Sequence, residues 1–77
     1  MPGRARKRSL TIAGHRTSIS LEDGFWSALK EVAKAQDRSV TEVVSEIDAG
    51  RDGIGLSGAI RIYLLEHYRQ RALRAER

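Results

Sequence analysis

The sequence predicts a small, mainly α-helical domain that begins with a short β-ribbon and ends with a third, C-terminal helix. Residues 16–21 alternate polar and apolar side chains, as a strand with one buried face does, whereas residues 21–37 and 39–49 carry apolar residues at helical spacing. Residues 56–74 resume a helical pattern beyond a glycine-rich loop. Because the chain has 77 residues and no cysteine, we expect one domain that packing alone holds together.

The predicted strand at residues 16–21 has two chemically different faces, because side chains in a strand have a period of two. Its apolar face consists of Thr17, Ile19 and Leu21. Its polar face consists of Arg16, Ser18 and Ser20. A guanidinium and two hydroxyls suit a polar surface such as the floor of a DNA groove. The backbone of this strand needs a partner, either the segment just before it or a second copy of the chain.

The preceding segment is one possible partner, since Ser9 to Ile12 alternates in the same way. Gly14-His15 would form the two-residue loop of a type II′ turn. The facing pairs would then be Leu10 with Ile19 and Ile12 with Thr17. The sequence therefore predicts a hairpin as one alternative and a strand pair between two subunits as the other.

The first helix is expected over Leu21 to Asp37. Acids stand in its first turn, where they favour the positive end of the helix dipole. Ser20 and Asp23 have the spacing of a capping box at its start. Apolar residues at helical spacing give this helix one stripe for a core.

The second helix is expected to begin near Ser39 or Thr41, because Ser39 and Glu42 again have capping-box spacing. It should end at Ala49-Gly50, where glycine supplies a C-cap. Its apolar stripe consists of Val40, Val43, Val44 and Ile47. Two short helices joined by so brief a turn form a helical hairpin or a crossed pair.

The C-terminal helix is expected over residues 56–74, with Ser57 as its N-cap. Its apolar positions form a stripe wider than one packing face needs: Leu56, Ala59, Ile60, Ile62, Tyr63, Leu64 and Leu65. We therefore expect cover on two sides, from the other helices and from a second subunit or another partner.

Charge is distributed unevenly along the chain, whose formal net charge is +4. Residues 1–21 carry five basic residues and no acid, and residues 51–77 are basic again. We expect residues 1–8 to form a flexible basic arm, which leaves residues 9–77 as the single folded domain. A basic end beside a polar strand face indicates a polyanion partner, nucleic acid ahead of an anionic membrane surface, and the alternative is a merely solvated tail.

Other classes of function find little support. No apolar run approaches the roughly 20 residues that span a bilayer, so we expect a cytoplasmic protein without a membrane partner. His15 and His67 are far apart, and no cysteine or paired carboxylate stands at metal-ligand spacing. The glycines of residues 50–55 precede no Lys-Ser/Thr pair of a phosphate-binding loop. We expect no enzyme activity, no cofactor and no metal site.

Three segments carry a family resemblance: Arg16-Thr17-Ser18-Ile19-Ser20-Leu21, Phe25-Trp26-Ser27-Ala28-Leu29 and Asp37-Arg38-Ser39-Val40-Thr41-Glu42-Val43-Val44. Their order of strand, helix, tight turn and helix resembles the ribbon-helix-helix DNA-binding proteins of the Arc and MetJ type. Four further stretches look like a bacterial subgroup with an added C-terminal helix: Lys7 to Ile12, Gly14 to Ser18, Glu46 to Asp48 and Leu56 to Arg61.

The resemblance implies an intertwined homodimer in which the strands of two subunits pair antiparallel and enter the major groove. Base edges would be read by Arg16, Ser18 and Ser20. The dimer interface would consist of Thr17, Ile19, Leu21, Val43, Val44 and Ile47. The phosphate contacts would come from the start of the second helix, with Arg38, Ser39, Val40 and Thr41, and from the basic arm, with Arg6, Lys7 and Arg8.

Two features depart from this family pattern. Glu22 stands where many members have proline, and it adds a negative charge near the reading surface. A hairpin in each subunit would also give the dimer a four-stranded sheet. Four strands at a spacing of about 4.8 Å would not fit a major groove about 12 Å wide.

The leading hypothesis is a sequence-specific transcriptional regulator, a repressor, that binds double-stranded DNA as a homodimer. The alternative is an antitoxin-like or adaptor protein that binds a protein partner through the C-terminal helix. Single-stranded nucleic-acid binding has less support, because the strand face lacks aromatic side chains on which bases would stack.

Overall fold

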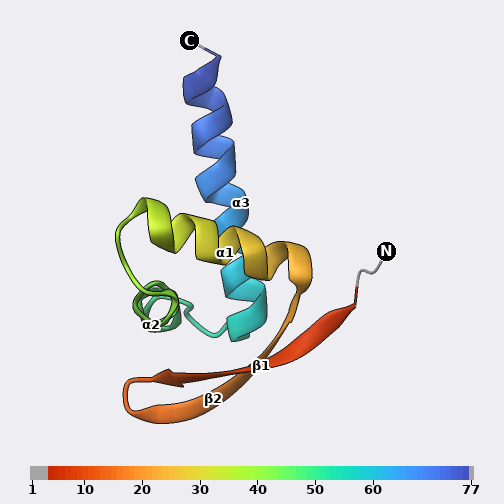
Figure 1. The fold of residues 1–77 in the computed structure, drawn as a ribbon, viewed down its shortest axis with the longest axis vertical. Coiled ribbons are helices and arrows are strands. Elements are labelled where there is room, and N and C mark those ends of the chain that lie inside the picture. Colours follow the sequence, from red (N-terminus) through yellow and green to blue (C-terminus); the bar gives the residue numbers. More distant parts are fainter. Residues whose placement is uncertain (1–3, 77) are drawn as a thin grey trace.

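The computed structural model, which describes residues 4–76, consists of a two-stranded antiparallel ribbon followed by three helices (Figure 1). The strands are β1 (Ala5–Ile12) and β2 (His15–Glu22), and the helices are α1 (Asp23–Ala35), α2 (Val40–Ala49) and α3 (Leu56–Ala75). The ribbon lies along one side of the molecule, and the C-terminal half of α3 extends away from the other elements (Figure 1). This order confirms the predicted fold class of a ribbon, two helices and a third, C-terminal helix.

The hairpin forms within one chain, but its predicted turn was wrong. The loop is Ala13-Gly14, because Ile12 pairs with His15, Leu10 with Thr17 and Arg8 with Ile19. Both loop residues have positive φ, 52° at Ala13 and 81° at Gly14, as a type I′ turn requires. The register is thus two residues away from the predicted one. A shift of two leaves every side chain on its expected face, since the period of a strand is two.

The Ala13 position gives the first testable prediction. An L-residue such as alanine adopts the left-handed region at a cost of about 1–2 kcal/mol, which asparagine largely avoids. Ala13→Asn is therefore expected to raise the free energy of unfolding by roughly 0.5–1 kcal/mol. Urea denaturation followed by circular dichroism measures this change. An unchanged or lowered midpoint would contradict the assigned turn.

The strand β1 begins earlier than predicted, at Ala5. Residues 5–8 therefore belong to the ribbon and not to a flexible arm, while residues 1–3 lie outside the described residues. Pairing of Ala5 with Glu22 gives this segment a partner along its whole length. Residues 5–8 show no alternation of polar and apolar side chains in the sequence, because the inward-facing Arg8 carries a charge where a strand usually has an apolar residue.

The helix starts show which capping predictions hold. The capping box of Ser39 and Glu42 is confirmed at α2, and this helix ends at Gly50 as predicted. The capping box predicted for Ser20 and Asp23 was wrong, since β2 continues to Glu22 and α1 begins at Asp23 without a side-chain cap.

Ser57 was also assigned wrongly as the N-cap of α3, a position that Gly55 occupies. The Ser57 hydroxyl instead accepts a hydrogen bond from the backbone N–H of Ser20, at 3.2 Å. A helix residue thus satisfies a backbone donor on the edge of the ribbon that β1 does not cover.

One hydrophobic core joins the inner face of the ribbon to all three helices. Its most deeply buried side chains are Leu21, Leu29, Val32, Val43, Val44, Ile60 and Leu64. The residue Ile12 joins this core from β1. Because the helices cover only one face of the ribbon, the other face is left to solvent.

Candidate nucleic-acid interface

The outer face of the ribbon is built from three cross-strand pairs: Lys7 with Ser20, Ser9 with Ser18, and Thr11 with Arg16. All six side chains are exposed. Directly opposed side chains in an antiparallel pair lie about 4.5–5.5 Å apart at Cβ, so the six form one continuous polar surface. We call these six residues the outer face.

The three predicted base-reading residues, Arg16, Ser18 and Ser20, thus lie together on this exposed surface. Sequence reasoning missed its other half, because Lys7 was assigned to an arm and no role was given to Ser9 and Thr11. The signal was present in the alternation of Ser9 and Thr11 with the apolar Leu10 and Ile12.

The partner of β2 is β1 of the same chain, which differs from the pairing between subunits that the resemblance implies. The predicted dimer residues Ile19, Leu21, Val43, Val44 and Ile47 lie in the core of this one chain, and Thr17 is half-buried. A role for them between subunits stays a prediction.

Arg8 lies on the inner face, where its charge is engaged in contacts within the chain. Its guanidinium lies 4.8 Å from the centre of the Trp26 ring and pairs with the Asp23 carboxylate at 2.6 Å. Arg6 also lies near Asp23, at 3.5 Å, but its side chain is 70% exposed. Of these two arginines, both predicted to contact phosphate, Arg6 is therefore the one with a guanidinium open to a ligand.

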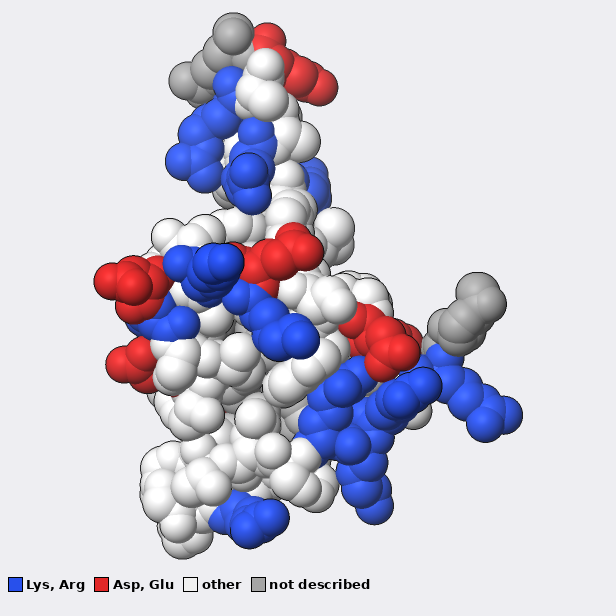
Figure 2. All heavy atoms as spheres, viewed as in Figure 1, with Lys and Arg blue, Asp and Glu red and all other residues white. Residues whose placement is uncertain are grey.

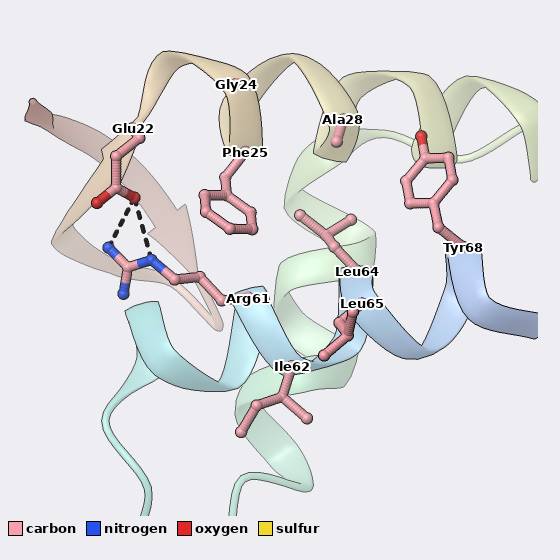
Figure 3. Close-up of a pocket in the computed structure, with 9 residues that line it drawn as sticks. All are labelled: Glu22, Gly24, Phe25, Ala28, Arg61, Ile62, Leu64, Leu65 and Tyr68. Atoms are coloured by element: carbon pink, nitrogen blue, oxygen red, sulfur yellow. Dashed lines mark hydrogen bonds and ion pairs between the residues drawn. The ribbon is translucent and has the colours of Figure 1, made fainter. Parts of the chain in front are cut away.

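The junction of β2 with α1 is held by an ion pair from α3. Arg61 donates to one carboxylate oxygen of Glu22 through Nε at 3.0 Å and through Nη2 at 2.9 Å (Figure 3). The hydrogen bond from the backbone at Glu22, and then the Arg61 guanidinium, hold the pKa of Glu22 below its usual range. The negative charge that set this chain apart from the family pattern is thus matched by a cation, and the pair fixes α3 against the base of the ribbon.

This ion pair predicts a dependence of stability on pH. Because the pKa of Glu22 is lowered on folding, the pair stabilises the fold above the ordinary glutamate pKa of about 4.3 and is lost as pH falls through the folded value. The unmodified protein is therefore expected to have a higher free energy of unfolding than Glu22→Gln at pH 7, and this difference should shrink below pH about 4.3 as Glu22 takes up a proton. Urea denaturation at pH 7 and pH 3 measures this, and a constant difference would contradict it.

The start of α2 was predicted to hold phosphate, and the structure shows how its donors are used. The N–H of Ser39 donates to the Glu42 carboxylate at 2.7 Å, and the N–H of Glu42 donates to the Ser39 hydroxyl at 3.1 Å. The hydrogen bond from the Ser39 backbone lowers the pKa of Glu42. This carboxylate thus already stands near the helix N-terminus. Anion binding there would fall to the N–H groups of Val40 and Thr41 and stays a prediction.

Arg38 was expected to assist at this helix start. Its guanidinium instead pairs with the Glu46 carboxylate at 2.6 Å and donates to the Gln36 side chain at 3.0 and 2.7 Å. These contacts direct it along α2, so phosphate binding by Arg38 would require it to exchange a carboxylate for the DNA backbone.

Basic side chains gather with few acids beside them over the N-terminal end of the ribbon and on the projecting end of α3, while those on the body of the molecule lie among acids (Figure 2). The ribbon region adjoins the outer face, which contains the cations Lys7 and Arg16. Cationic side chains can pair with DNA phosphates, and hydroxyls beside them can form hydrogen bonds with base edges in a groove.

Residues 4–76 contain no group of three or more metal-binding side chains that could hold an ion. No helix in the described part of the chain is long and apolar enough to cross a membrane.

Comparison with known proteins agrees with this geometry. A family model described as a ribbon-helix-helix domain matches residues 5–68, which include both strands, α1, α2 and most of α3. The searches of curated proteins and of solved structures found no match. The chain belongs to the ribbon-helix-helix family, whose members are typically DNA-binding regulators or antitoxins.

Proposed function

We propose that this protein is a sequence-specific DNA-binding transcriptional regulator, a repressor, that inserts its ribbon into the major groove. The observation that carries the proposal is the outer face, an exposed set of four hydroxyl and two cationic side chains. The next cross-strand pair along the ribbon includes the acid Glu22, whose charge Arg61 already balances. Arginine reads guanine bidentately, and serine and threonine accept or donate to several bases, so these residue types suit base edges.

The steric difficulty of a four-stranded sheet is avoided if the ribbons of two subunits do not pair with each other. Two strands at a spacing of about 4.8 Å fit a major groove about 12 Å wide, whereas four do not. Each chain contains a complete two-stranded ribbon. In a homodimer, each subunit would place its own ribbon in a separate stretch of the groove, and a two-fold dimer would favour a palindromic site.

The proposed contacts divide by chemistry. Arg16, Ser18 and Ser20 read base edges, and Ser9 and Thr11 stand beside them on the same surface. The phosphate contacts come from the cations Arg6 and Lys7 of β1 and from the start of α2, with the N–H groups of Val40 and Thr41. Phosphate contacts supply affinity and register, while base contacts supply discrimination.

The salt dependence of DNA binding tests this proposal. If a dimer neutralises about six phosphates, the logarithm of affinity should fall against the logarithm of salt concentration with a slope near −5. Mobility-shift titrations at two salt concentrations, with duplexes selected from a random pool, give both the slope and the preferred site. An absence of DNA binding at both concentrations would refute the proposal.

A second candidate function is that of an antitoxin-like or adaptor protein, and the apolar surface of α3 favours it. Ile62, Leu65 and Leu73 are 52%, 57% and 55% exposed. The whole helix cannot be deleted as a test, because Ile60 and Leu64 belong to the core. Leu65→Asp keeps the core intact, so loss of a captured protein partner with DNA binding unchanged would support this function.

A further inference from the structure

The solvent side of α3 carries an apolar stripe that the described chain leaves uncovered. Ile62, Leu65, Arg69 and Leu73 follow one another at spacings of three and four residues, which places them on one face of the helix. This face lies opposite the core residues Ile60 and Leu64, and residues 69–76 are exposed throughout. The helix extends well past the other elements (Figure 1), so its last turns gain little support from the rest of the chain.

The residues of this face are arranged symmetrically about its centre, so the face is complementary to the same face of an antiparallel copy. Ile62 and Leu73 stand at equal distances from the midpoint between His67 and Tyr68, and so do the acid Glu66 and the base Arg69. An antiparallel copy would therefore place Ile62 against Leu73 and Glu66 against Arg69, twice. Glu66 and Arg69 already lie 3.7 Å apart within one chain and are well exposed.

We propose that α3 pairs antiparallel with α3 of a second copy of this chain, around a two-fold axis between His67 and Tyr68. Each central charge then has an opposite charge in its own helix and another in the second copy, while apolar residues close both ends. Such a contact uses the same patch on both subunits, as an isologous interface does. This inference goes beyond the proposed function, because the association requires no DNA.

A groove beside the stripe receives the end of the second helix. It has a volume of about 720 Å³, lies between α1 and α3, and is walled by Phe25, Ala28, Ile62, Leu65 and Tyr68 (Figure 3). In the antiparallel arrangement, the C-terminal turn of the second α3, with its Leu73, lies along this groove.

The charge pattern permits a test with two single substitutions. Glu66→Arg leaves only positive charge at the centre of the pair, and Arg69→Glu leaves only negative charge. Each variant alone is expected to self-associate at least tenfold more weakly than the unmodified protein, whereas an equimolar mixture should recover association. Arg74→Glu changes the net charge as Arg69→Glu does but lies off the stripe, so it should associate like the unmodified protein.

Sedimentation equilibrium without DNA measures this association, as a step from monomer to dimer or, where chains also pair elsewhere, from dimer to tetramer. Failure of the mixture to recover that step would overturn the proposal. Capture of a foreign protein by the stripe while the unmodified chain shows no such step would overturn it as well.

Disulfide trapping tests the register, since the chain has no cysteine of its own. Ile62→Cys and Leu73→Cys, each alone, should give no covalent dimer under mild oxidation, because like positions lie about 16 Å apart in the antiparallel pair. Mixed together they should give one, since a disulfide joins Cα atoms within about 7 Å. Trapping of either variant alone to the same extent as the mixture would overturn the antiparallel pairing.

Discussion

Leu29→Ala is expected to lower the free energy of unfolding by about 2–5 kcal/mol. Leu29 lies in the middle of α1 with 0% of its surface exposed, in the core that joins the ribbon to the helices. Truncation removes buried methyl groups and leaves a cavity that so small a core closes only in part. A domain of this size has a total stability of roughly 5–15 kcal/mol, so the variant should lose a large fraction of it. Urea denaturation followed by circular dichroism measures the difference.

Leu73→Ala is the matched control, since it removes the same atoms from a side chain that is 55% exposed. At a concentration low enough to keep chains apart, it should change the free energy of unfolding by no more than about 0.5 kcal/mol. Similar losses in the two variants would contradict the core described above.

Arg16→Ala is expected to weaken binding to the preferred DNA site by about 1–3 kcal/mol and to relax discrimination at one base pair. Arg16 is exposed on the outer face opposite Thr11, so its loss should leave the fold unchanged. Competition titrations with the preferred duplex and with single-base variants of it measure both effects.

Arg74→Ala provides the comparison, because it removes the same charge from the exposed end of α3. Its effect should be small and equal for all sequences, as expected of a charge that meets no base. If Arg16→Ala also weakened every sequence equally, the outer face would contribute affinity without reading bases.

Features that depend on neighbours in the sequence could be predicted from it. The capping box at Ser39 needs only Glu42 three residues later, and the end of α2 needs only Gly50. The period of two alone predicts which face of the ribbon carries Arg16, Ser18 and Ser20. This prediction held although the predicted register was wrong, because an error of two residues leaves each side chain on the same face.

Features that join distant parts of the chain could not be predicted. The Arg61 guanidinium meets Glu22 across 39 residues, and the Ser57 hydroxyl meets Ser20 across 37. The inward position of Arg8 depends on a carboxylate and an indole that only the folded α1 supplies. The turn was missed because alanine at a positive φ has no sequence signal.

Mapping the DNA-contacting surface by NMR tests the central claim most directly. Amide resonances of the uniformly ¹⁵N-labelled protein are followed during titration with the preferred duplex. We predict that the largest shifts fall on the outer face, at Lys7, Ser9, Thr11, Arg16, Ser18 and Ser20, with smaller shifts at the start of α2. Shifts confined to α3, with the ribbon unchanged, would contradict the claim that the ribbon reads DNA.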